Sequence, residues 1–74
     1  MSARIRPLGM LKMYIGDQLE IAVEAGSTVR ETLVTLSIPP DLIAIVIVNE
    51  TMQPKDYCIQ EGDEIKLLAM TRGG

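Results

Sequence analysis

One helix signal constrains the fold of this chain more than any other feature. Thr28 and Glu31 have the spacing of a capping box, in which each side chain binds the other residue's free backbone N–H. Apolar residues then recur at helical spacing: Val29, Leu33 and Leu36. Two consecutive prolines at positions 39–40 end the helix at or before Ile38. We therefore expect one short helix.

The rest of the chain carries strand and turn patterns. Residues 18–24 alternate cleanly, with Leu19, Ile21 and Val23 directed inward. We expect residues 1–7 to be a short lead-in, because Pro7 has no N–H to give to a sheet. A looped region is expected around Met52, Tyr57 and Ile59. The predicted strands are residues 8–15, 18–24, 42–48 and 64–70.

This order predicts a single α+β domain. The segment at 42–48 is apolar and β-branched throughout, which favours a strand with little solvent on either face. A hairpin, one helix and further strands give a mixed sheet with one main helix packed on one face. If the first and last strands pair in parallel at the centre, the arrangement is a β-grasp, although spacing alone does not prove that pairing. We expect the domain to span residues 1–70 and residues 71–74 to form a mobile tail.

Composition excludes several classes of function. Ten acidic and seven basic residues give the chain a formal net charge of −3, which argues against a nucleic-acid binder and suits a partner with a basic docking surface. His is absent, and Cys58 is the only cysteine, so the sequence contains neither a disulfide nor a thiolate metal cluster. No apolar run approaches a membrane span, and the first residues lack the pattern of a signal peptide. The expected location is the cytoplasm.

Several polar residues invite a functional interpretation that the pattern does not favour. Cys58 has no His nearby, and we expect a buried, inert thiol. Glu61, Asp63 and Glu64 surround one glycine turn without the ligand spacing of a calcium loop, so a solvated turn is expected and no metal site. Glu50 and Asp56 are expected on the surface.

The last predicted strand has a second face that could be a partner surface. Lys66, Leu68 and Met70 share this face. With Met10 and Tyr14 on a neighbouring strand, they could form an exposed apolar patch of the kind that marks a binding surface. The alternative is a second, minor core beneath the loop at residues 52–59.

Three stretches of the chain resemble a known family. Residues 26–33 (GSTVRETL) are similar to the family's helix start, and residues 48–49, 53–57 and 60–65 to its Val-Asn turn and Gly-Asp-Glu strand start. Gly73-Gly74 is similar to its C-terminus. The family is the ThiS/MoaD-like sulfur carriers, which are ubiquitin-like β-grasp proteins. The chain departs from it at Glu50, where the family often has Gly, and at Arg72, which makes the tail more like that of ubiquitin.

The resemblance implies a function located in the tail. The Gly74 carboxylate would be adenylated by an E1-like activating enzyme and converted to a thiocarboxylate, while Gly73 and Arg72 bind in the partner's channel. The alternative without a function is a frayed end for Gly73-Gly74 and a solvated side chain for Arg72. The implied partners are the adenylating enzyme, a persulfide sulfur donor and an acceptor synthase. The chain would bind no cofactor and catalyse nothing itself, and its activating partner would use ATP.

Three functions compete at this point. The first is a sulfur carrier for cofactor biosynthesis (thiamine or molybdopterin) or tRNA thiolation. The second is a ubiquitin-like modifier conjugated through Gly74, and the third is a non-catalytic β-grasp binding module. Neither nucleic acid nor membrane is an expected partner.

Overall fold

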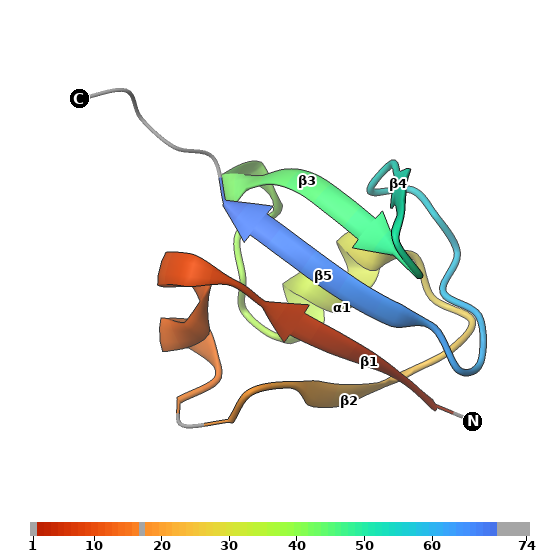
Figure 1. Cartoon of the computed structure of the whole chain (residues 1–74), viewed down its shortest axis with the longest axis horizontal. Helices are drawn as coiled ribbons and strands as arrows, with labels where there is room; N and C mark the ends of the chain where they lie inside the picture. The colour runs from red at the N-terminus through yellow and green to blue at the C-terminus, as the bar shows by residue number, and fades with distance from the viewer. Residues whose placement is uncertain (1, 17, 70–74) are drawn as a thin grey trace.

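The computed structural model describes residues 2–16 and 18–69 of the 74-residue chain. Five strands form one mixed sheet in the order β2-β1-β5-β3-β4, and Figure 1 shows α1 packed behind it. Strands β1 and β5 pair in parallel at the centre, and the other neighbours are antiparallel. The elements are β1 (Ser2–Pro7), η1 (Gly9–Tyr14), β2 (Ile21–Glu24), α1 (Val29–Thr35), η2 (Pro40–Leu42), β3 (Ile43–Val48), β4 (Thr51–Gln53) and β5 (Glu64–Ala69). This arrangement is the predicted β-grasp.

Helix α1 begins with the predicted capping box and ends in a Schellman motif. The Glu31 N–H donates to Thr28 Oγ1 (3.1 Å), and the Thr28 N–H donates to Glu31 Oε1 (2.9 Å). After the helix, Ser37 has a φ of 63° and donates its N–H to the Val34 carbonyl. The Ile38 N–H donates to the Leu33 carbonyl, which completes a Schellman motif. The helix therefore ends at Thr35, before the two prolines are reached.

The first strand lies where a lead-in was expected, and that prediction was wrong. Ala3, Ile5 and Pro7 are buried, and their neighbours are exposed. Arg4 and Leu8 donate their N–H groups to β5 residues or to the residue just before β5, so the nitrogen of Pro7 faces the β2 side. Pairing with β2 ends at Ile5, so no donor is needed from Pro7.

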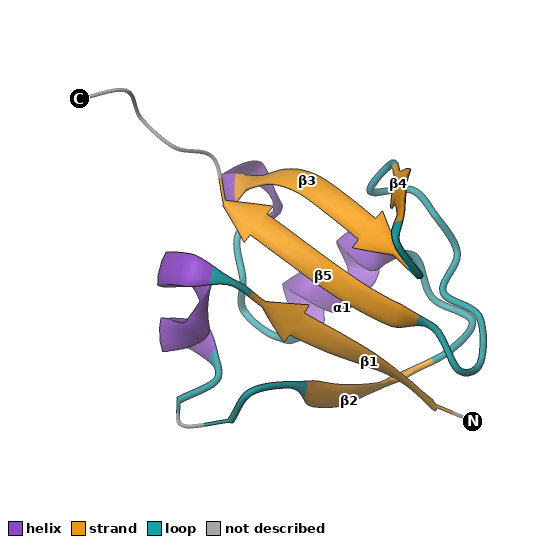
Figure 2. Cartoon of the chain, viewed as in Figure 1, coloured by secondary structure: helices purple, strands orange, loops and turns teal. Residues whose placement is uncertain are grey.

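Residues 8–15, predicted as a strand, are instead mostly the 3₁₀ helix η1 (Figure 2). Gly9 has a φ of 61°, which turns the chain out of the extended conformation. The three-residue period then directs Leu11 into the core together with the half-buried Tyr14. Met13, in the same segment, is 73% exposed. The pair β1–β2 is thus a hairpin with a long connection.

Two further strands differ from expectation. Strand β2 is confirmed but starts at Ile21, and Leu19, predicted to point inward, is 66% exposed. Strand β3 is confirmed, but only one side of it is buried. A bulge at Ala44 lets Ile43 and Val46 both face the core. The core-facing residues of β3 are therefore not spaced by two, and a run in which every residue is apolar gives no sign of this. Residues 51–53, predicted as loop, form the short strand β4.

The turn before β4 contains Glu50, at the position where the ThiS/MoaD-like family often has Gly. Asn49 and Glu50 connect β3 to β4, and their φ angles are 50° and 71°. Positive φ at both central residues is the signature of a type I′ turn. Glu50 therefore occupies a conformation that favours glycine.

One core lies between the sheet and the helix. Its buried members are Ala3, Ile5, Leu11, Val23, Val29, Leu33, Ile38, Ile43, Val46, Val48, Ile59, Ile65 and Leu67. Within the described ranges, no helix has the length and apolar character needed to cross a membrane.

Candidate functional site

The predicted tail site lies outside the described residues. Met70, Arg72, Gly73 and Gly74 all fall there, and so does the boundary of the predicted tail. What the structure places is their attachment point, the C-terminal end of β5. This strand lies between β1 and β3, and Leu67 pairs with both Pro7 and Val46. The tail is therefore attached to the central strand of the sheet.

The opposite face of β5 from α1 forms a patch with β3 and β4. Leu68 pairs with Ile45, and Lys66 pairs with Ile47, so these side chains share the face that the helix leaves open. Met52 pairs with Ile47 from the other side and is 69% exposed. We name this surface the open-face patch, and its described members are Ile45, Ile47, Met52, Lys66 and Leu68.

Only part of this patch agrees with the predicted surface. Lys66 and Leu68 lie on it as expected, and the former is exposed and the latter half-buried. Met10 and Tyr14 were assigned to a neighbouring strand, but both lie in η1. Strand β3 takes that neighbouring place.

The alternative of a minor core beneath the loop at residues 52–59 is wrong for the described residues. Tyr57 and Ile59 pack against the main core, on the helix side of the sheet. The Val29 N–H donates to the Tyr57 carbonyl (3.0 Å), which ties this loop to the start of α1. The loop therefore leaves the open face uncovered.

The half of the open face over β1 and β2 is charged. Arg4 and Arg6 both approach the Glu20 carboxylate, with N–O distances of 3.3 and 3.8 Å. Arg6 is also the register partner of Lys66. The open face thus combines apolar side chains on one half with a cluster of cations beside them, although the whole chain is acidic.

A buried carboxylate fixes the start of β5, and the sequence interpretation of it was wrong. Asp63 was expected in a solvated turn, but its relative exposure is 5%. Its carboxylate accepts hydrogen bonds from the Tyr57 hydroxyl (2.7 Å), from Asn49 Nδ2 (2.9 Å) and from the Gln60 N–H (2.8 Å). Asn49 Oδ1 in turn accepts the Glu64 N–H (3.0 Å). This network joins the β3–β4 turn to β5.

The network also shifts two pKa values. Burial alone would raise the pKa of the Asp63 carboxyl. The hydrogen bonds from Gln60, Tyr57 and Asn49 outweigh that effect and hold this pKa below its ordinary value of 3.8. The hydrogen bond to Asp63 is the main cause that raises the pKa of Tyr57 above its ordinary value of 10.0. Both shifts favour a phenol that donates to a carboxylate.

The remaining polar candidates lie on the surface. Cys58 is exposed, which contradicts the expected buried thiol, and its Sγ lies 3.5 Å from the Gly26 carbonyl oxygen. Glu50, Asp56, Glu61 and Glu64 are exposed, as predicted for the first two and for the turn. Among the described residues, no group of His, Cys, Asp or Glu side chains could hold a metal ion.

Sequence reasoning missed Ile45, Ile47 and Met52 as surface residues. The run at 42–48 was interpreted as buried on both faces. One short helix covers only one face of a sheet, so the predicted architecture already implied a half-exposed β3. That argument is the signal that could have found the open-face patch.

Comparisons with known proteins agree with this fold. The ThiS family model matches residues 8–74. SAMP1 from Haloferax volcanii, solved by crystallography, has a TM-score of 0.70 at 18% identity, with 100% of both chains covered. The HVO 2177 protein of Haloferax volcanii, solved in solution, has a TM-score of 0.75 at 19% identity, covering 100% of this chain and 87% of that chain. The search of curated proteins found no match. The similar structures show a ubiquitin-like β-grasp.

Proposed function

The chain belongs to the ThiS family, and on this premise we propose that it is a ubiquitin-like sulfur carrier loaded at Gly74. An E1-like enzyme adenylates the Gly74 carboxylate with ATP, and a sulfur donor converts the adenylate to a thiocarboxylate. The observation that carries the proposal is the family match, which extends through Gly73-Gly74 and over the strand that leads to them.

The chemistry explains why a separate enzyme is needed. A carboxylate is a poor electrophile at neutral pH, so its oxygen must first attack the α-phosphate of ATP, and pyrophosphate leaves. The terminal sulfur of a partner's persulfide then attacks the acyl carbon, and AMP leaves. A thiol finally reduces the acyl disulfide and releases the thiocarboxylate. The chain itself supplies the acyl group.

Glycine at the last two positions suits such a partner. Without a Cβ, Gly73 and Gly74 can enter a channel too narrow for side chains and can adopt backbone angles closed to other residues. In this proposal Arg72 contacts the channel entrance of the activating enzyme. The central position of β5 supports the proposal, because the strand to which the tail is attached is paired on both sides, with β1 and with β3.

The open-face patch is the surface that we assign to partner docking. Its apolar members lie on β3, β4 and β5, and Leu68 is two positions before the predicted last residue of the domain. An enzyme seated on this patch would hold the base of the tail. Lys66, beside Arg6, adds positive charge to the contact and favours an acidic partner surface there. We extend this docking surface to Met70.

The acceptor is a synthase that takes the sulfur into cofactor biosynthesis, of thiamine or molybdopterin, or into tRNA thiolation. We propose that the carrier acts in the cytoplasm. A protein modifier conjugated through Gly74 is the second candidate, and the ubiquitin-like sequence Arg72-Gly73-Gly74 favours it. The two share the adenylate and differ in the nucleophile that consumes it, a sulfur atom or a lysine amine.

ATP–pyrophosphate exchange with an E1-like adenylating enzyme tests this function. The full chain should support exchange, and a chain ending at Arg72 should not. Exchange that is equal for the two chains would overturn the assignment to Gly74. Mass spectrometry of cell proteins then separates the candidates, because a Gly-Gly remnant on target lysines indicates a modifier and a C-terminal thiocarboxylate indicates a carrier. A plain binding module would show neither product.

A further inference from the structure

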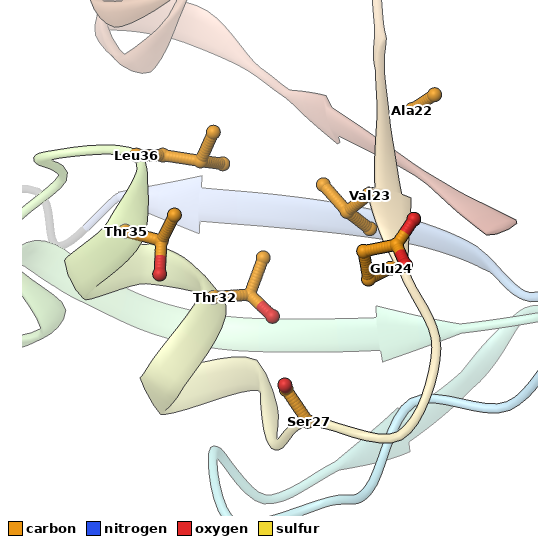
Figure 3. Close-up of a pocket in the computed structure, with 7 residues that line it drawn as sticks. All are labelled: Ala22, Val23, Glu24, Ser27, Thr32, Thr35 and Leu36. Carbon is orange, nitrogen blue, oxygen red and sulfur yellow. The ribbon is translucent and has the colours of Figure 1, made fainter.

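A second candidate binding surface lies on the helix side of the sheet, away from the tail. A groove of ≈ 310 Å³ runs between β2 and α1 (Figure 3). Figure 3 shows Val23 directed from β2 towards the helix, while Thr32 and Leu36 are directed from the helix towards β2. The groove is lined by Ala22, Val23, Glu24, Ser27, Thr32, Thr35 and Leu36.

The wall of this groove formed by β2 is an open sheet edge. In the described part of the chain, β2 pairs with β1 alone. The Arg4 N–H donates to the Asp63 carbonyl (2.9 Å), and the Ser2 carbonyl accepts the Gly62 N–H (3.0 Å), so both residues face the β5 side. Their register partners, Ala22 and Glu24, therefore face the other way.

The backbone groups of Ala22 and Glu24 thus form a short template for another strand. Each residue offers one N–H donor and one C=O acceptor at the free edge, and the two residues have the spacing of alternate strand positions. A partner strand would place one side chain beside Val23, inside the groove, and the adjacent residue opposite Glu24.

The two edges of the sheet differ in how they are protected. The opposite edge, β4, has only three residues and is followed directly by Pro54, which cannot donate to an added strand. Strand β2 is also short, with four residues, and carries the charged Glu24, but it contains neither Lys nor Pro and has no bulge in its pairing with β1. A sheet edge without proline or a bulge keeps its backbone donors and acceptors available to another strand.

The groove chemistry specifies what that strand carries. Val23 and Leu36 provide an apolar floor, and the Thr32 and Thr35 hydroxyls already donate to helix carbonyls, at 3.0 and 3.1 Å. Among the described residues that line the groove, Glu24 is the only ionisable one. It takes part in none of the ion pairs among the described residues. A strand that complements this groove therefore carries an apolar residue next to a cationic one.

We propose that the groove between β2 and α1 binds an extended segment of a partner protein by strand addition to β2. The segment carries a β-branched apolar residue in the groove and a neighbouring Lys or Arg opposite Glu24. This site is separate from the open-face patch, because β1 lies between β2 and β5. Both surfaces can be occupied at once, and neither site requires the other.

A peptide titration followed by ¹⁵N NMR tests the proposal. The probe is Ac-Arg-Val-Arg-Val-Arg-NH₂, and its matched control is Ac-Arg-Arg-Arg-Val-Val-NH₂, which has the same charge without the alternation. The probe should shift the amides of Ala22, Glu24 and the groove residues and slow exchange of the two edge N–H groups. The control should bind at least about tenfold more weakly, because its side chains do not alternate between the two faces.

Two variants locate the contact. Ala22→Pro removes an outward N–H without touching the β1 ladder and should weaken probe binding by about tenfold, while Ala22→Thr keeps the N–H and should retain binding. Glu24→Gln should weaken binding by about fivefold through loss of one exposed ion pair. The Glu24 variant decides the matter if Ala22→Pro lowers the folded fraction.

Three results would overturn the proposal. The first is probe binding that is unchanged in both Ala22→Pro and Glu24→Gln. The second is a set of amide shifts centred on the open-face patch. The third is a dimer of the free protein in sedimentation that Ala22→Pro abolishes, because this would make the occupant a second copy of the chain. The Gly74 carboxylate of the Glu24→Gln variant should be adenylated at the wild-type rate. Failure of the strand-addition proposal therefore leaves the sulfur-carrier proposal standing, and failure of the sulfur-carrier proposal leaves the strand-addition proposal standing.

Discussion

Adjacent residues of strand β5 lie on opposite faces of the sheet, and the two faces have different environments. Ile65 and Leu67 face α1 and are buried, whereas Lys66 and Leu68 face away from the helix. The buried side connects β5 to the core, and the other side belongs to the open-face patch, which we propose as a docking surface. A single helix makes this difference unavoidable, because it covers only one face of the sheet. Substitutions on the two sides should therefore affect different measurements.

The largest expected effect is a loss of stability caused by a substitution on the buried face of β5. Leu67→Ala should lower the free energy of unfolding by about 2–5 kcal/mol, because it opens a cavity in the core. Leu68→Ala on the same strand should lower it by about 1 kcal/mol or less, since Leu68 is only half-buried. Urea denaturation measures both. Equal losses would contradict the assignment of the two faces.

The carboxylate at the start of β5 should give the next largest effect. Asp63→Ala leaves the Tyr57 hydroxyl, Asn49 Nδ2 and the Gln60 N–H without their acceptor. A loss of about 1–3 kcal/mol in the free energy of unfolding is expected. Glu64→Ala, one position on and exposed, is the control and should change little. A similar loss in the control would show that the network does not matter.

On the open face the expected effect is on function. Leu68→Asp should raise the KM of the activating enzyme for this chain by about tenfold, measured well below the melting temperature of the variant so that it remains folded. Val34→Asp is the matched control, because Val34 is also an exposed apolar residue, at 64%, but lies on α1. Steady-state adenylation with both variants measures the difference. An unchanged KM for Leu68→Asp would remove the docking role of the patch.

The pH dependence of stability should separate Asp63 from the exposed carboxylates. Its pKa is lower in the folded chain than the ordinary value of 3.8, so its contribution is fully present above that pH. It is lost as the pH falls through the folded value. The stability difference between wild type and Asp63→Ala should therefore be constant from neutral pH to about pH 5 and shrink below 3.8. A difference that grows on acidification would contradict the pKa direction.

The smallest expected effects come from two turns with strained residues. Glu50 has a φ of 71° and Ser37 a φ of 63°, and both conformations favour glycine. Glu50→Gly and Ser37→Gly should each raise the free energy of unfolding by about 0.5–1 kcal/mol, because the left-handed penalty is removed. Thermal melts of the single and double variants measure the gain. A loss of stability in both would show that neither turn is strained.

Local signals in the sequence predicted the helix well. The capping box at Thr28 and Glu31 needs only neighbouring residues, so its outcome did not depend on the rest of the fold. The same holds for β5, whose alternation is regular. The parallel pairing of the first and last strands was stated as a condition of the β-grasp, because spacing alone does not give it. The strand that makes this pairing is β1, not the predicted strand at residues 8–15.

The errors occurred where non-local contacts decide the structure. Residues 8–15 alternate like a strand, but the positive φ of Gly9 and the burial of Leu11 in the core favour a 3₁₀ helix. Pro7 argued against a strand only because the direction of its nitrogen could not be known. Asp63 looked like a turn residue, since its partners Tyr57 and Asn49 come together only in the folded chain. Ile45 and Ile47 of the open-face patch were not predicted, because the bulge at Ala44 hides the alternation of β3. Met52 was not predicted because its segment was interpreted as a loop.

The most direct test of the account is the intact mass of the chain after incubation with ATP, an E1-like adenylating enzyme and a persulfide donor under reducing conditions. The account predicts that one oxygen of the Gly74 carboxylate is replaced by sulfur, and that a chain ending at Arg72 stays unchanged. A full chain that keeps its carboxylate while the enzyme loads its own known carrier would contradict it.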